Sequence, residues 1–213
     1  GDPVRVERHR ARPHGAQRAD LLARHGAHLT QVLRDDHVGV ALLEHFEPFE
    51  SPLDENPFNG RLNSPCYLGR GLESSKHSPH EEFPIVATTY SVTEHWQTGG
   101  QTRLCPALVE AMPAQFIEMS YELAAEKGIE NGEKVRVWNN RASIEITALV
   151  THRFKPFTVN GEKLHQVGMT HHFGWSRLFG TDQNMVNDLT PNVGDANSQT
   201  PEYKAFLVNI EKL

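Results

Sequence analysis

A dense polar segment at residues 88–103, TTYSVTEHWQTGGQTR, holds the side chains best suited to binding a ligand. Its hydroxyl, imidazole, indole and amide groups supply hydrogen-bond donors. The pair Gly99-Gly100 lets backbone N–H groups approach an oxyanion without side-chain interference. This combination suits a ligand that carries both a phosphate and a heterocycle. The residues alone leave an ordinary polar surface loop as the alternative interpretation.

A second polar cluster, HHFGW at residues 171–175, begins with two adjacent histidines, His171 and His172. Adjacent residues on a strand point to opposite faces, and no third ligand stands at a useful spacing, which argues against joint chelation of one metal ion. Three interpretations of the pair stay open: contact with a ligand, ordinary histidines of the core or surface, and metal ligation.

A third candidate segment is the long loop at residues 184–204, which precedes the last strand that the pattern predicts. Long loops in compact domains often carry function. The loop contains Asn187 and ends on Lys204, whose ammonium group is a cationic donor suited to a phosphate.

The elements that must position these segments are short strands and brief helices from residue 83 onward. Ser120 is a helix N-cap, Gly128 is a helix stop, and Asn160-Gly161 is typical of a hairpin turn. The patterns predict strands at 84–90, 115–119, 134–138, 142–150 and 203–210, and helices at 106–112 and 121–127. Many short strands with tight turns predict a small β-barrel, in which the polar segment directly follows the first strand.

The chain before residue 83 has a different composition. Residues 1–40 form an arm rich in arginine and histidine, in which 19–34 have the apolar spacing of a helix. A solvated arm, a functional basic arm and an aberrant stretch of sequence are the three interpretations of it. Residues 41–82 contain five prolines that block regular helix, so we expect an extended connector that packs on a surface. The aromatic side chains expected to make this contact are Phe46, Phe49, Phe58 and Tyr67.

Bulk properties weigh against several classes of protein. A net charge of −6 over 213 residues argues against a general nucleic-acid binder, which would present a basic surface. No apolar run approaches the roughly 18 residues of a membrane helix, and the N-terminal residues lack the apolar core of a secretory signal. Cys66 and Cys105 are too few for an iron–sulfur cluster or a four-cysteine zinc site within this chain. A disulfide between them stays open.

Several short motifs resemble segments of one known family. The segment VTEHWQTG resembles the EHW-x-TG cofactor loop of formate dehydrogenases and periplasmic nitrate reductases, EPFESP resembles a connector of formate dehydrogenases, and GIENGEKV resembles a signature of double-psi β-barrels. VNDLT and TPEYKA resemble two later segments of the family. These motifs lie at residues 92–99, 47–52, 128–135, 186–190 and 200–205. Over residues 41–213 the chain therefore resembles the C-terminal domain of the dimethyl sulfoxide reductase family, and within it the large subunit of formate dehydrogenases.

The resemblance implies a mainly β fold: a six-stranded double-psi β-barrel over residues 83–213, with short flanking helices and an extended N-terminal connector over 41–82. It implies a molybdopterin guanine dinucleotide cofactor that carries molybdenum or tungsten. The binding residues that it implies are Thr89, Tyr90, Ser91, Val92, Thr93, Glu94, His95, Trp96, Gln97, Thr98, Gly99, His172, Asn187 and Lys204. Gly99 would give the ligand close approach.

The resemblance also implies partners. They are the remaining domains of a formate dehydrogenase large subunit and an iron–sulfur electron-transfer subunit, in the periplasm or alternatively in the cytoplasm. There formate would become CO2, and two electrons would pass to iron–sulfur clusters. In the family a cysteine or selenocysteine of an upstream domain binds the metal, and Cys66 and Cys105 lie outside that context, so we expect no catalysis by this chain alone. Neither a nucleic-acid partner nor a membrane span is expected.

Two other interpretations of the barrel stay open. A stand-alone double-psi barrel can serve as a protein-interaction module without any cofactor, because a fold does not determine function. A self-processing barrel decarboxylase needs a Gly-Ser cleavage site, and no Gly-Ser pair occurs in the sequence.

Overall fold

The computed structural model describes residues 6–9, 46–53, 55–56, 64–68, 76–174, 185–195 and 198–213. The helix expected over 19–34 and the side chains of Phe58 and Tyr67 lie outside this description, so the expectations about them stay predictions.

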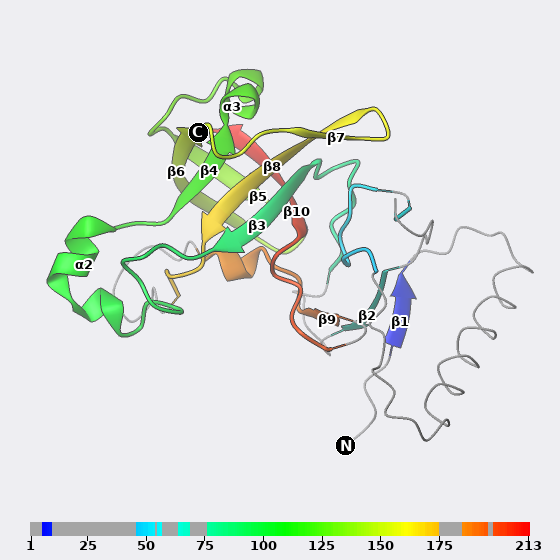
Figure 1. Cartoon of the computed structure of the whole chain (residues 1–213), viewed down its shortest axis with the longest axis horizontal. Coiled ribbons are helices and arrows are strands. Elements are labelled where there is room, and N and C mark those ends of the chain that lie inside the picture. Colours follow the sequence, from blue (N-terminus) through cyan, green and yellow to red (C-terminus); the bar gives the residue numbers. More distant parts are fainter. Residues whose placement is uncertain are drawn as a thin grey trace, which may run out of the picture.

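Six strands close into a barrel, which forms the central body in Figure 1. The strands are β3 (Ile85–Tyr90), β4 (Phe116–Ser120), β5 (Lys134–Trp138), β6 (Ser143–Thr151), β8 (Glu162–Thr170) and β10 (Phe206–Lys212). Their hydrogen-bonded order is β3-β10-β5-β6-β4-β8, and the parallel pairing of β3 with β8 closes the ring. β7 (Phe157–Val159) pairs with β8 across the predicted hairpin turn at Asn160-Gly161.

The pairing pattern of the barrel has an internal symmetry. It stays the same when the first three barrel strands in chain order, β3, β4 and β5, are exchanged with the last three, β6, β8 and β10. β3 pairs in parallel with β8, and its counterpart β6 pairs in parallel with β4, the counterpart of β8. The antiparallel pairs β3–β10 and β6–β5 correspond in the same way, whereas β5–β10 and β4–β8 join counterparts directly. Two interlocked parallel pairs related by this pseudo-twofold symmetry make a double-psi barrel, so the predicted fold is confirmed.

Alternation along the strands puts apolar side chains inside the barrel. In β5, Val135 and Val137 are buried, whereas Lys134 and Arg136 face outward. Other buried members of the core are Ile85, Ala87, Ile117, Met119, Ile144, Ile146, Val167, Met169, Phe206 and Val208. Full burial of one large apolar side chain contributes about 1.5–3 kcal/mol, so this interior is the main source of the barrel's stability.

The helix α3 (Tyr121–Lys127) follows β4 with the ends that the sequence predicts. The Ser120 hydroxyl accepts a hydrogen bond from the Leu123 N–H at 3.1 Å, and Gly128 ends the helix with a φ of 65°. Leu123 is buried against the barrel core, so the helix covers one end of the barrel.

A second sheet joins the arm, the connector and the long loop before β10. β2 (Ser64–Leu68) pairs antiparallel with both β1 (Val6–His9) and β9 (Val193–Asp195). Cys66 packs with Phe49 and Val193 in a small buried cluster, which places one expected connector aromatic against a surface. The sequence does not predict that part of the connector pairs as a regular strand, because short strands that pair across large sequence separations leave no periodic pattern.

The last strand begins later than the sequence predicts. β10 starts at Phe206 rather than at residue 203. The cause is local: the Thr89 hydroxyl donates to the Tyr203 carbonyl at 3.0 Å, and the side chain of Lys204 is bonded to Thr89, so these two residues contact the end of β3 instead of extending β10.

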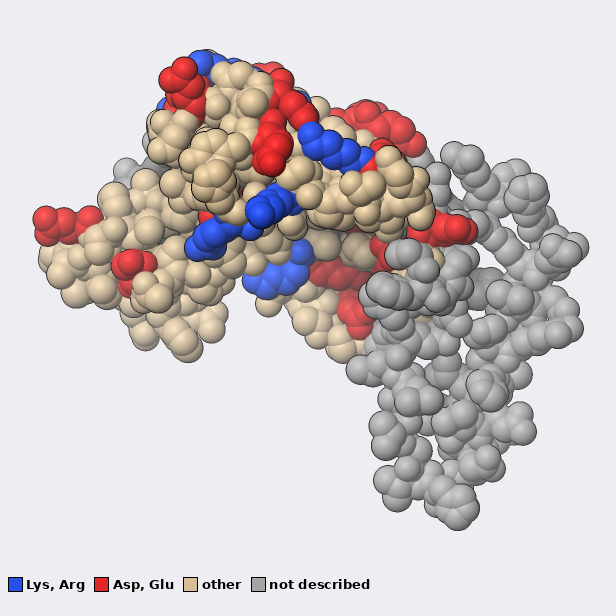
Figure 2. All heavy atoms as spheres, turned by 45° about the horizontal axis from the view of Figure 1, so that its top comes forward, with Lys and Arg blue, Asp and Glu red and all other residues tan. Residues whose placement is uncertain are grey.

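Two short helices project from the barrel. η2 (Thr102–Leu104) and α2 (Pro106–Ala111), the latter close to the predicted 106–112, contain no buried residue. Figure 2 shows this projection as mostly uncharged, whereas acidic and basic side chains are interspersed over the barrel. Within the described ranges, no helix has the length and apolar character needed to cross a membrane.

Candidate functional site

Four chain segments meet at one end of the barrel, the lower end in Figure 1. β3 and β8 run in parallel and both finish there, with Tyr90 opposite Thr170. β10 runs antiparallel to β3 and therefore starts there, at Phe206. The turn between β5 and β6 lies at the same end, since Asn139 Nδ2 donates to the Leu207 carbonyl at 3.1 Å. We call this end the site end, because the predicted polar segment, histidine pair and lysine all lie on it.

Lys204 is bonded directly to the end of β3. Its Nζ donates to the Thr89 carbonyl at 2.6 Å and to the Thr89 hydroxyl at 3.1 Å. Thr89 is buried, whereas Lys204 is exposed, and partial burial of its ammonium group lowers the pKa of Lys204. Two predicted site residues that stand 115 positions apart in the sequence are thus in contact.

The side chain of His172 fastens the polar loop that follows β3. Nε2 accepts from the Val92 N–H at 2.9 Å, and Nδ1 lies 2.6 Å from the Gln97 carbonyl. A backbone N–H only donates and a carbonyl only accepts, so the ring is the neutral tautomer with its proton on Nδ1. Burial lowers the pKa of His172, which favours this neutral form. The buried ring thereby ties both halves of the loop together.

The side chain of His95 is buried within the same loop and is fully engaged. Nε2 donates to the Met112 carbonyl at 2.8 Å, since a carbonyl can only accept. Nδ1 lies 3.1 Å from the Thr102 hydroxyl, which also accepts from the Trp96 N–H at 3.1 Å. The imidazole therefore links the loop to the segment around α2, and neither ring nitrogen is left for a ligand.

Gly99 is required for packing of the chain on itself. Its φ is 79°, and a Cβ at this position would lie 2.2 Å from the His172 carbonyl oxygen. Its N–H donates to the Trp96 carbonyl at 2.9 Å. The family resemblance implies that the small size of this residue serves the approach of a ligand, whereas in the structure it is the backbone at His172 that lies close to it. Arg103 adds to this packing by donating to the Gly174 carbonyl at 2.7 Å.

The outer surface of the loop presents its remaining polar groups to solvent. The exposed residues are Ser91, Thr93, Trp96, Gln97 and Thr98. Trp96 is 62% exposed, which is unusual for the largest amphipathic side chain. Gln97 has a φ of 51°, a left-handed backbone conformation that His172 stabilises through the Gln97 carbonyl.

Tyr90 makes its side-chain contacts with the barrel wall. Its hydroxyl donates to Glu118 of β4 at 2.7 Å, and Glu118 also accepts from the Thr151 hydroxyl at 2.6 Å. Burial and the Glu118 carboxylate raise the pKa of Tyr90 above its ordinary value. At the site end Tyr90 therefore contributes its backbone carbonyl rather than its phenol. His171 Nδ1 lies 3.0 Å from this carbonyl oxygen.

The adjacent histidines do not point to opposite faces. Their ring centroids are 4.4 Å apart, because β8 ends at Thr170 and the pair lies beyond the strand. Burial lowers the pKa of His171, and the nearby His172 and Lys204 lower it further. Among the residues that the structure describes, no group of three or more histidine, cysteine or acidic side chains is arranged to hold a metal ion. Cys66, which is buried, and Cys105, which is exposed, are both free thiols.

Asn187 lies in the short helix η3 (Val186–Asp188) and is exposed. Val186 and Leu189 on either side of it are buried in the barrel core, which holds the helix on the site end. Asn187 accepts through its carbonyl from the Thr190 hydroxyl at 3.0 Å. Among the described residues, no hydrogen bond joins it to the other predicted residues, although it lies at the same end of the barrel.

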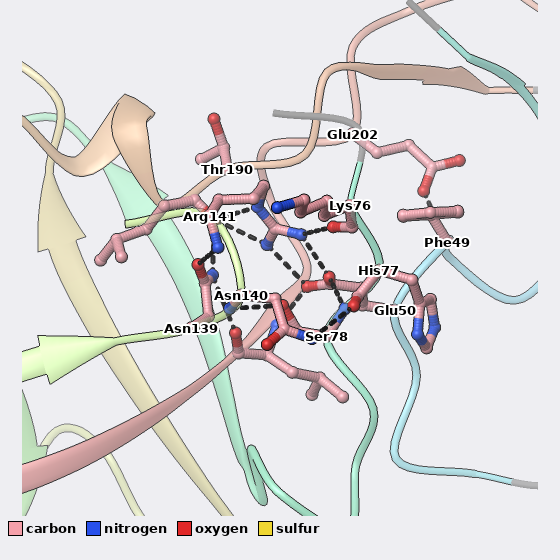
Figure 3. A network of polar contacts seen from close by, with 12 residues as sticks. Phe49, Glu50, Lys76, His77, Ser78, Asn139, Asn140, Arg141, Thr190 and Glu202 are labelled. Carbon is pink, nitrogen blue, oxygen red and sulfur yellow. Dashed lines mark hydrogen bonds and ion pairs between the residues drawn. The ribbon is translucent and has the colours of Figure 1, made fainter. Parts of the chain in front are cut away.

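Sequence reasoning missed a buried ion pair beside this site. Arg141, in the turn between β5 and β6, pairs with Glu50 of the EPFESP segment (Figure 3). Both side chains are buried, at 1% and 0% exposure. The motif at residues 47–52 was the available signal, but nothing in the sequence indicated which arginine would face it.

Known proteins resemble this chain over most of its length. The family profile described as "Molydopterin dinucleotide binding domain" matches residues 85–207. Formate dehydrogenase subunit alpha of Megalodesulfovibrio gigas is 44% identical over 171 residues, which cover 80% of this chain and 17% of the relative. The major subunit of the nitrate-inducible formate dehydrogenase of Escherichia coli (strain K12) is 46% identical over 170 residues, 79% of this chain and 16% of the relative.

A third relative gives the same picture. Formate dehydrogenase 2 subunit alpha (cytochrome c-553) of Nitratidesulfovibrio vulgaris is 46% identical over 171 residues, 79% of this chain and 17% of the relative. The chain thus spans 16–17% of the length of these curated relatives.

Proposed function

This chain belongs to the molybdopterin dinucleotide-binding domain family, and from that premise we propose that its site end holds a molybdopterin guanine dinucleotide through the residues assigned below. The observation that carries the assignment is that the Lys204 cation is bonded to Thr89 at the end of β3, directly before the polar loop at residues 91–99 that His172 holds in place. Family membership supports the class of ligand, and the geometry supports the choice of residues.

The groups at the site end fit an anionic ligand with a polar ring. Lys204 has three N–H donors, of which two are directed at Thr89, and its charge suits a phosphate. The exposed residues Ser91 and Thr93 add hydroxyl donors on the loop that follows Thr89. The exposed indole of Trp96 offers both a flat apolar surface and an N–H group, which suits a heterocycle.

We assign ten of the predicted residues to two roles. Ser91, Thr93, Trp96, Gln97, Thr98 and Lys204 present exposed groups and contact the cofactor, and Asn187 faces it from η3. His95, His172 and Gly99 hold the loop in shape, because their polar atoms or their missing side chain are engaged within the protein. When bound, the cofactor supplies two-electron redox chemistry at its metal, and the residues of this chain bind and orient it.

We extend the proposal to a larger enzyme that oxidises formate to CO2. Its support is the identity of 44–46% with subunits named as formate dehydrogenases. In that enzyme residues 83–213 are the cofactor-binding domain and 41–82 the connector. Molybdenum or tungsten, a cysteine or selenocysteine ligand from an upstream domain, an iron–sulfur subunit and a periplasmic rather than cytoplasmic location belong to the same proposal.

The test is the cofactor content of the chain purified together with the domains and subunits that accompany it. After iodine oxidation and acid release, we expect the fluorescence of an oxidised pterin and, after phosphodiester cleavage, GMP. A folded complex that yields neither pterin nor GMP would contradict the proposal. A protein partner without any pterin would favour the stand-alone interaction module instead.

A further inference from the structure

One buried ion pair joins five segments that are distant in the sequence (Figure 3). Arg141 Nη1 and Nη2 donate to the two Glu50 carboxylate oxygens at 2.5 and 2.9 Å, a bidentate pair at 1% and 0% exposure. Arg141 also donates to the Leu189 carbonyl, from Nε at 3.0 Å and from Nη2 at 2.7 Å. It donates to the Lys76 carbonyl as well. The guanidinium is thus bonded to two parts of the connector, at Glu50 and at Lys76, and to the segment after η3.

The carboxylate of Glu50 is equally engaged. Besides Arg141 it accepts from the Ser78 N–H at 2.6 Å and from the Leu207 N–H at 2.8 Å. Leu207 is the second residue of β10, so the connector is bonded to the start of the last barrel strand. Its neighbour Phe49 adds a second bond, because the Phe49 N–H donates to Glu202 at 2.6 Å.

Lys204 therefore lies between two points that the connector holds. Glu202 is bonded to Phe49 on one side of it, and Leu207 is bonded to Glu50 on the other. Asn187 lies two residues before Leu189. The Leu189 carbonyl accepts from Arg141 Nη2 at 2.7 Å and from Asn139 Nδ2 at 2.8 Å. Both C-terminal parts of the candidate site are consequently held through the same pair.

Stability alone does not account for a buried ion pair, because an apolar pair of similar volume is often as stable or more so. What apolar side chains cannot supply is the set of directional bonds to the Leu189 carbonyl and the Leu207 N–H. We propose that Glu50 and Arg141 are positioning residues of the cofactor site: docking of the connector through this pair places Asn187 and Lys204 for binding. This inference rests on the proposed function for its ligand, and on the geometry for the positioning itself.

The first arm of the test measures positioning without any cofactor. Glu50→Gln keeps the shape of the side chain but directs an amide N–H at groups that donate. Hydrogen exchange of the Leu207 amide and of the amides at 186–190 should accelerate about tenfold or more, whereas exchange in β4 and β6 stays unchanged. The matched control is Glu211→Gln, which breaks an exposed pair with Arg136 away from the site. Unchanged exchange at Leu207 and 186–190 in a folded Glu50→Gln protein would overturn the inference.

The second arm measures cofactor retention in the purified complex that carries the chain. Glu50→Leu combined with Arg141→Met replaces the pair with apolar side chains and leaves no buried charge without its partner, so the variant should remain folded. We expect this folded double variant to lose pterin and GMP on gel filtration, whereas Glu211→Gln retains both. Retention equal to wild type would overturn the inference, because stability would then be all that the pair supplies. If the wild-type complex itself carries no pterin, the proposed function fails, and the exchange arm alone decides whether the pair positions these segments.

Discussion

The two ends of the barrel are built in different ways. At the end that carries α3, the chain reverses through local features: the Ser120 cap, the Gly128 stop and the turn at Asn131-Gly132. Exposed ion pairs such as Arg136–Glu211 join neighbouring strands near this end. Each of these features involves a few consecutive residues or two exposed side chains, so the loss of one leaves the others intact.

At the site end, polar side chains form hydrogen bonds with backbone groups of distant segments. His172 reaches back 80 and 75 positions to Val92 and Gln97, Lys204 reaches 115 positions to Thr89, and Glu50 is bonded to Leu207 across 157 positions. This difference indicates that the α3 end is shaped by features of neighbouring residues, whereas the shape of the site end depends on a few hydrogen bonds between distant residues. Single substitutions should therefore have unequal effects at the two ends.

The largest effect is expected for Arg141→Ala. It leaves the Glu50 carboxylate buried and unpaired, so we expect a loss of about 3–5 kcal/mol in the free energy of unfolding. Arg136→Ala removes a half-exposed partner and should cost about 0–1 kcal/mol. Urea unfolding of the two variants measures the difference, and equal losses would contradict the contrast between the ends.

The next largest effect is expected for Gly99→Ala. Its Cβ would lie 2.2 Å from the His172 carbonyl oxygen in a left-handed conformation, so overpacking adds to backbone strain and we expect a loss of about 2–4 kcal/mol. Gly132 has a φ of 90°, but a Cβ added there would meet no atom within 4 Å, so Gly132→Ala should cost only about 1 kcal/mol. Thermal unfolding compares the two, and a smaller loss at Gly99 than at Gly132 would refute the packing role of this glycine.

A third effect concerns binding rather than folding. His95→Ala combined with Lys204→Ala removes a loop fastener and a cation, and one lost charged hydrogen bond costs about 1.5–3 kcal/mol of binding free energy. Metal and pterin content after gel filtration should fall in the purified complex, whereas Lys163→Ala at an exposed pair should leave both unchanged. If the double variant kept the metal and pterin content of the wild type, His95 and Lys204 would not belong to the binding site.

The smallest effect concerns pH. Folding lowers the pKa of His172 below its ordinary 6.5, so its contribution to stability is complete above that pH and is lost as the pH falls toward the lowered pKa. The pKa of His171 moves in the same direction. We expect the melting temperature to fall on acidification from about pH 7.5 to about pH 5.5, and to fall less steeply in His172→Gln. Parallel profiles for the two proteins would show that His172 is not buried as the neutral ring.

The contrast between the ends also explains what the sequence could predict. Local signals such as Ser120, Gly128 and Asn160-Gly161 placed α3 and the turn between β7 and β8 correctly, and the strand pattern at residues 134–138 predicted β5. The resemblance of the short motifs located the polar loop and Lys204. These signals need only neighbouring residues or a family pattern, and they carry no information about pairing partners.

The rest required the structure, because it depends on contacts between distant residues. No local pattern shows that Arg141 faces Glu50, that β2 pairs with β9, or that Lys204 leaves β10 in order to reach Thr89. The sequence also could not show that His172 and Gly99 serve the loop itself, since a ligand and a backbone segment select the same residue types.

The most direct test of the site is hydrogen exchange of the cofactor-loaded complex against the same complex from cells that cannot make the pterin. If the site end binds the nucleotide, loading should protect amides at 91–99, at 186–190 and next to Lys204, and should leave those of α3 and the turn at 131–132 unchanged. Protection confined to the α3 end, or absent from all three site segments in a loaded complex, would contradict the assignment.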